Sequence, residues 1–97
     1  MSESCPYARL TANSATPVVI AGAGQGTLIT VNVNSKGAAG NICTIYDDIT
    51  NTSGHEMAII DTTVPTAGLV YDAAFTRGLC AVLNGGATAA DITVTFK

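Results

Sequence analysis

The chain has 97 residues, of which 47% are hydrophobic, 11% charged and 5% aromatic, with a net charge of −3. This composition excludes a disordered tail, and the length provides for one domain with a small core. The acidic balance and the scattered basic residues argue against a nucleic-acid partner. The longest fully apolar runs, such as Val18–Ala21, are far too short to span a bilayer, which argues against a membrane partner.

Short β-prone runs alternate with turn signals along the whole chain, and no segment has sustained helical periodicity. In chain order, the predicted strands are Tyr7–Asn13, Thr16–Ala21, Thr27–Asn34, Asn41–Asp47, His55–Asp61, Gly68–Phe75, Leu79–Asn84 and Asp91–Lys97. Pro17 cannot donate to a ladder, so it marks a strand start or an edge strand, and Pro65 lies in a connection between two strands.

Alternation within these runs predicts which side chains are buried. In Asn41–Asp47, both alternating faces carry apolar residues, so both are expected to be partly covered. In the final run, Ile92, Val94 and Phe96 are expected to face inward and complete a sheet. The predicted core consists of Ile29, Val31, Val33, Ile45, Ile59, Leu69, Tyr71, Phe75, Leu79, Val94 and Phe96.

About eight short strands in one domain predict an all-β fold, a two-sheet antiparallel β-sandwich with jelly-roll or Greek-key topology. An up-and-down barrel is the less favoured alternative. We assign residues 1–15 to an N-terminal arm and first strand, and residues 16–97 to the sandwich, within a single domain overall. We expect the arm, Met1 to about Leu10, to be loose until a partner orders it.

Three cysteines, Cys5, Cys43 and Cys80, stand without CxxC spacing, which argues against a disulfide framework or a zinc site. Cys43 and Cys80 are predicted to be small buried hydrophobes. A bridge between those two is geometrically conceivable but requires an oxidising compartment, and Cys5 is expected to be exposed. The N-terminus lacks the basic end and apolar core of a signal peptide, so we expect synthesis in a cytoplasm.

No motif in the sequence predicts catalysis. His55 is the only histidine, and a zincin would need a second one where Ile59 stands. A Ser53–His55 dyad would have no orienting group. Gly22–Gly26 lacks the spacing of a phosphate loop, and the glycosylation triplet at Asn51 is interpreted as turn chemistry.

Four aspartates provide one metal hypothesis, in which Asp47 and Asp48 meet Asp61 and Asp72 around a calcium ion. No EF-hand spacing supports it, and solvated loop acids are the more common explanation. We therefore assign no catalytic, cofactor-binding or metal-binding residue and no cofactor, and we expect the protein not to be an enzyme.

Several segments resemble small structural proteins of tailed-phage virions. The resemblance lies in TPVVIAGAGQGTLITVNVN (Thr16–Asn34), CTIYDD (Cys43–Asp48) and the stretch from IIDTTVP to ADITVTFK (Ile59–Lys97). It extends over most of the chain, from Thr16 to Lys97, and consists of strand and turn patterns. Catalytic signatures have no part in it, so it supplies no functional residues.

The resemblance implies a β-sandwich without a cofactor on the surface of a virion. We expect a capsid decoration, or cement, protein that binds the major capsid protein on the outer head surface and stabilises contacts between capsid subunits. A homotrimer is the expected oligomer, since it would bury further apolar surface.

The alternative is a phage fibre, tail or surface-adhesion module with an Ig-like or carbohydrate-binding role. The loops SKGAAG (Ser35–Gly40) and DITNTSG (Asp48–Gly54) would present its site. The small number of aromatic rings argues against sugar binding.

Overall fold

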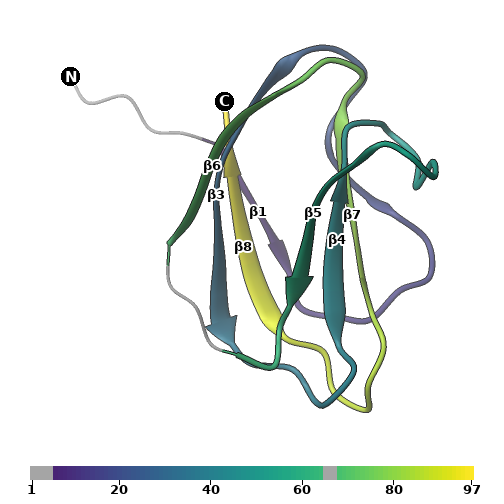
Figure 1. The fold of residues 1–97 in the computed structure, drawn as a ribbon, viewed down its shortest axis with the longest axis vertical. Helices are drawn as coiled ribbons and strands as arrows, with labels where there is room; N and C mark the ends of the chain where they lie inside the picture. The colour runs from purple at the N-terminus through teal and green to yellow at the C-terminus, as the bar shows by residue number, and fades with distance from the viewer. Residues whose placement is uncertain (1–5, 65–67) are drawn as a thin grey trace.

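The computed structural model describes residues 6–64 and 68–97, and its regular secondary structure there is entirely β. The strands are β1 (Tyr7–Leu10), β2 (Val18–Ala21), β3 (Gly26–Ser35), β4 (Ile42–Tyr46), β5 (Glu56–Asp61), β6 (Leu69–Phe75), β7 (Leu79–Asn84) and β8 (Asp91–Phe96). They form two antiparallel four-stranded sheets, β1-β8-β3-β6 and β2-β7-β4-β5 (Figure 1). The predicted all-β, two-sheet fold is confirmed.

The strand pairing is that of a jelly roll. β4 pairs with β5, β3 with β6, β2 with β7 and β1 with β8, so the chain is one long antiparallel hairpin wound into two layers. The pairs β3–β8 and β4–β7 complete the sheets. Of the two sandwich topologies that the sequence leaves open, the structure has the jelly roll.

The core fills the space between the two sheets. Its largest members without exposed surface include Leu28 and Ile92 from the first sheet and Ile45 and Leu79 from the second. Predicted core residues that are buried are Val31, Val33, Ile45, Phe75, Leu79 and Val94, whereas Leu69, Tyr71 and Phe96 are partly buried against them.

Two predicted core residues lie elsewhere. A register shift between Leu28 and Thr30 turns Leu28 into the core in place of Ile29, which is only partly buried. In β5, Ala58 and Ile60 face inward, and Ile59 is 68% exposed on the outer face. The prediction failed because β5 has apolar residues on both of its faces, so alternation alone did not choose between them.

β1 is part of the sandwich, because it pairs with β8 over all four of its residues. The sandwich therefore begins at Tyr7 rather than at Thr16. The expectation of a loose arm is wrong for Tyr7–Leu10. Its remainder up to Cys5, the exposure of Cys5, and the interpretation of Pro65 lie outside the described residues.

A buried asparagine joins four separate segments of the chain. Asn41 Oδ1 accepts hydrogen bonds from Thr62 Oγ1 at 2.6 Å and from the Ala90 N–H at 3.1 Å. Asn41 Nδ2 donates to Asn13 Oδ1 and to the Gly85 carbonyl, each at 2.8 Å. Since Asn41 has no exposed surface, its side chain is fully engaged with the protein and holds the loops at one end of the sandwich in place.

Asn41→Ala should lower the free energy of unfolding by about 3 kcal/mol, because it leaves the Ala90 N–H and the Gly85 carbonyl without the partner they have in the fold. Urea unfolding followed by circular dichroism measures the change. The control is Asn51→Ala, an exposed loop position, for which we expect a change of less than about 0.5 kcal/mol. Equal stabilities for the two variants would contradict the role of Asn41.

Candidate functional site

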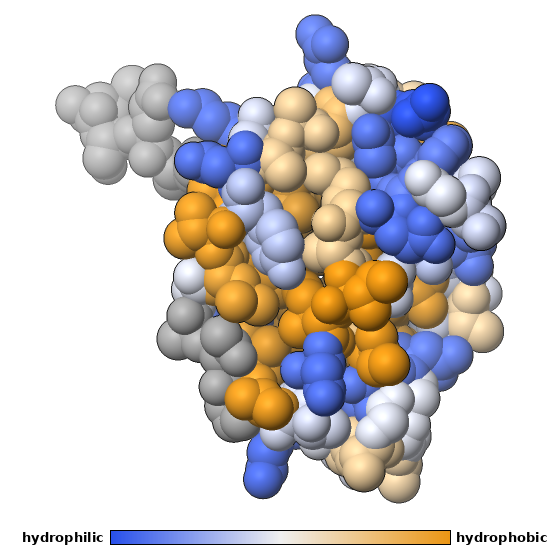
Figure 2. All heavy atoms as spheres, in the orientation of Figure 1, coloured by the Kyte–Doolittle hydropathy of each residue, from blue (hydrophilic) through white to orange (hydrophobic). Residues whose placement is uncertain are grey.

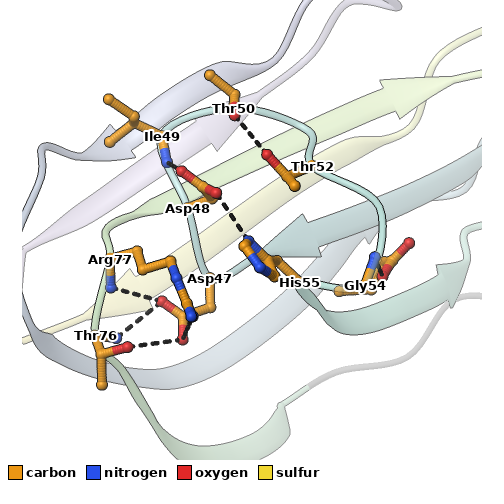
Figure 3. Close-up of polar contacts among 10 residues, drawn as sticks. Asp47, Asp48, Ile49, Thr50, Thr52, Gly54, His55, Thr76 and Arg77 are labelled. Carbon is orange, nitrogen blue, oxygen red and sulfur yellow. Dashed lines mark hydrogen bonds and ion pairs between the residues drawn. The ribbon is translucent and has the colours of Figure 1, made fainter.

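The loop between β4 and β5 contains the histidine and two of the aspartates singled out from the sequence (Figure 3). Asp48 Oδ2 lies 2.8 Å from His55 Nδ1, and Asp48 Oδ1 accepts the Ile49 N–H at 2.7 Å. The hydrogen bond with His55 is the main cause that lowers the pKa of Asp48, and the Ile49 N–H adds to it. The His55 ring therefore closes this loop on itself.

Asp47 connects the same loop to the turn between β6 and β7 (Figure 3). Its Oδ1 accepts the backbone N–H groups of Thr76 and Arg77, each at 2.8 Å, and the Arg77 guanidinium lies 3.8 Å from Oδ2. Burial raises the pKa of Asp47, but the hydrogen bonds from Arg77 and Thr76 together outweigh it and lower the pKa. This carboxylate holds two loops together.

The four aspartates considered as calcium ligands are not brought together. Asp61 lies opposite Ile42 at the start of β4, whereas Asp47 follows the end of that strand. Asp72 belongs to β6, in the other sheet. Within the described part of the chain, no three His, Cys, Asp or Glu side chains are grouped closely enough to hold a metal ion.

Cys43 and Cys80 are both buried and both free, as predicted for small hydrophobes. Burial raises the pKa of Cys43 to about 12. Burial, with a contribution from the Asp48 charge, raises the pKa of Cys80 to about 11. Neither thiol is ionised near neutral pH, so neither has the character of a nucleophile.

The central strands of the first sheet, β3 and β8, carry a polar network on their outer face, whereas the edge strands β1 and β6 expose Tyr7 (70%) and Val70 (69%) there. Asn34 Nδ2 donates to Thr93 Oγ1 at 2.7 Å and to Asp91 Oδ1 at 3.2 Å, and Asn34 Oδ1 accepts from Asn32. Arg9 on β1 forms an ion pair with Asp91, with Nε 2.9 Å from Oδ1. Apart from the contact between Asn32 and Asn34 within β3, these contacts cross from one strand to the next and join β1, β8 and β3.

The outer face of the second sheet is apolar along its middle. Thr44 of β4 lies opposite Val82 of β7 on one side and Ile59 of β5 on the other. Ile59 is 68% exposed, Val19 of β2 52% and Ile42 of β4 42%. We call this surface the apolar face, defined by Val19, Ile42, Thr44, Tyr46, Ile59 and Val82.

An open depression of 510 Å³ adjoins one end of the apolar face. The loop Lys36–Gly40, Ile42, Asp61 and Thr63 line it. It includes most of the SKGAAG loop that the sequence suggested for an adhesion site. It is shallow, with one cation and one anion among its lining residues, and most of its lining surface is apolar.

The apolar face was not predicted as a surface. Ile42 and Ile59 were assigned to a partly covered face and to the core, respectively. The signal was present, since β4 and β5 each have apolar residues in both alternating positions. A strand that is apolar on both faces in a two-layer sandwich must expose one of them unless another surface covers it.

Comparisons of the chain with protein-family models, curated proteins and solved structures found no match. The resemblance to virion proteins therefore stays a prediction. Residues 6–64 and 68–97 contain no helix of the length and apolarity that crossing a membrane requires.

The pKa of Asp91 is lowered to about 2, mainly by the hydrogen bond from Arg9 and then by that from Asn34. Because the folded-state pKa lies below the model-peptide value of 3.8, the contact stabilises the fold above that pH and is lost as the pH falls toward 2. A carboxyl NMR titration should give this low midpoint. In Arg9→Gln the midpoint should rise toward 3.8, and an unchanged midpoint would contradict the assignment.

Proposed function

We propose that the protein is a non-enzymatic structural component of a tailed-phage virion, a decoration protein on the outer surface of the head. The contrast between the two outer sheet faces is the observation that carries the proposal. On the outer face of the first sheet, side chains of the two central strands, β3 and β8, form a polar network, and the exposed apolar residues Tyr7 and Val70 lie on the edge strands β1 and β6. The outer face of the second sheet exposes Val19, Ile42 and Ile59 across three of its four strands. Several exposed apolar side chains on one sheet face are typical of a protein–protein contact surface.

In this proposal the apolar face binds the major capsid protein, and the outer face of the first sheet is turned to solvent. The flat surface of a sheet suits contact across a junction between two capsid subunits, since it presents several strands at one level. Covering each large apolar side chain contributes roughly 1–2 kcal/mol, so a few of them supply useful affinity when many copies bind one particle.

The depression beside the SKGAAG loop favours a second candidate, an adhesion module on a fibre or tail. Its volume of 510 Å³ lies within the range of small-molecule sites, and Lys36 and Asp61 provide groups of both charges. Its open shape makes it the weaker candidate, because an enclosed pocket removes more of a ligand from water.

Immunogold labelling of phage particles from a lysate that contains the chain tests the location. We expect regular label over every head, because a decoration protein is repeated across the capsid. Label confined to tails or fibres would favour the adhesion module. Unlabelled particles, with the antigen free in the lysate, would refute the virion proposal.

Val19→Asp tests the role of the apolar face. We expect at least a tenfold loss of affinity for particles stripped of the protein, because a carboxylate would be buried against an apolar contact. The matched control is Val70→Asp, since Val70 is an exposed apolar residue (69%) of the other sheet. Equal binding by the two variants, measured by co-sedimentation, would show that the apolar face is not the contact surface.

A further inference from the structure

The two sheets have four edge strands, β1, β6, β2 and β5, and three of them are poor templates for another strand. β1 and β2 have four residues each, and β2 follows Pro17 and contains a register shift. β6 is interrupted by a register shift and by Asp72, whose φ is 49°. These features end or bend a ladder, so pairing along these edges is short.

β5 differs from the other three. Its run Glu56–Asp61 has no Pro, Gly or Lys, and its register with β4 is regular from Ala58 to Asp61. The shift in register is confined to its beginning, between the partners of Ile45 and Tyr46. Among the described residues, only β4 pairs with it, and no strand of residues 6–64 or 68–97 lies along its other edge. β5 is the edge best suited to pairing with another chain.

The register identifies the backbone groups that face this open edge. The Thr62 N–H donates to the Asn41 carbonyl at 3.2 Å, in line with the pairing of Asp61 with Ile42. Hydrogen-bonded and non-hydrogen-bonded positions alternate along an antiparallel pair, so Ile60 and Ala58 also bond to β4. The N–H and C=O groups of Ile59 and Asp61 therefore point away from β4, in the plane of the sheet, toward the open edge.

We propose that two copies of the chain associate through antiparallel pairing of their β5 edges about a two-fold axis at Ile59. Ile59 then bonds to its own counterpart, because its N–H and C=O groups face outward in both copies. A two-fold contact uses the same patch twice, and β5 provides such a patch. A three-fold trimer built by strand pairing would require a second, different edge in each copy.

The charges of β5 select the position of the axis. With the axis at Ile59, Asp61 lies opposite Met57 of the second copy, and the two Asp61 carboxylates stand at opposite ends of the contact. An axis at Ile60 would place the two carboxylates diagonally across neighbouring strands, where like charges repel. The register centred on Ile59 avoids that repulsion.

The surface beside this edge is apolar, which supports the same pairing. Figure 2 shows apolar side chains gathered in the middle of the face seen in Figure 1, between the strands of the two sheets. Met57 of β5 and Leu69 and Tyr71 of β6 are only partly buried against the core. A second copy at the β5 edge would shield part of this surface and extend the apolar face across the axis.

Sedimentation of the full chain over a range of concentrations tests the pairing. We expect a single-chain mass at low concentration and a doubled mass at high concentration. Ile59→Pro should stay at the single-chain mass at every concentration, because it removes an N–H that faces the open edge and leaves the bonds to β4 in place. Circular dichroism checks that this variant is folded.

A cysteine pair provides a test that does not depend on the fold of the proline variant. In a Cys5→Ser background, Ile59→Cys should form a covalent dimer on oxidation, because directly opposed hydrogen-bonded residues lie about 5.5 Å apart between Cα atoms. Val19→Cys is the matched control, since Val19 is exposed on the same face but lies on β2, at the far edge of the sheet. It should stay uncrosslinked under the same conditions.

A single-chain mass at all concentrations, a mass of three chains, or equal crosslinking at positions 59 and 19 would overturn the proposal. These measurements use the isolated protein. Their failure would therefore leave the virion proposal standing, and unlabelled particles would leave the pairing standing.

Discussion

The hydrogen bonds of Asn41 are the constraint on which one end of the sandwich depends. A jelly roll brings together loops that are far apart in sequence, and backbone pairing alone does not hold such loops in register. Here one buried amide contacts Asn13, Thr62, Gly85 and Ala90, which belong to three different connections, with Gly85 and Ala90 at the two ends of the connection between β7 and β8. Because every bond of that amide stays inside the protein, exchanging it for an apolar group would leave polar backbone groups without partners. At the opposite end, Asp47 performs the same task through Thr76 and Arg77.

Buried or half-buried polar contacts hold the loops at both ends of the sandwich. The side chains on the outer faces of the two sheets are not needed for that task, so the two faces can differ in polarity. The outer face of the first sheet carries an ion pair and an asparagine network whose members bond to one another across β1, β8 and β3. The apolar face and the β5 edge meet at Ile59, which belongs to both. One residue thus takes part in two proposed contacts, one through its side chain and one through its backbone. A change of the Ile59 side chain that keeps the backbone N–H therefore tests the contact of the apolar face, whereas loss of that N–H tests the pairing of the β5 edges.

The sequence was sufficient to predict the class of fold, because alternation and turn residues separate the strands at nearly their observed bounds. It also predicted the burial of Val31 and Val33 of β3 and of Cys43 and Cys80. The sequence-based prediction failed at Ile59, where the strand is apolar in both alternating positions. It also failed at Leu28 and Ile29, where a register shift puts Leu28 in the core in place of Ile29. Those outcomes are decided by pairing with distant strands, which no local pattern contains. The role of Asn41 was missed for the same reason, since its partners lie up to 49 residues away.

The nested strand pairing also bears on how the chain reaches its fold. β4 and β5 are joined by a short loop, so they can pair first at little entropic cost, and each later pair is then brought closer by the one inside it. The outermost pair, β1 with β8, joins residues from the two ends of the chain, and the Phe96 N–H donates to the Pro6 carbonyl at 3.0 Å. The loop-closure entropy of that pair is small only after the inner pairs have formed. The strand pairs would therefore form in order from β4–β5 outward to β1–β8, and β8, which the first sheet needs for completion, is also the last of the eight strands to be synthesised.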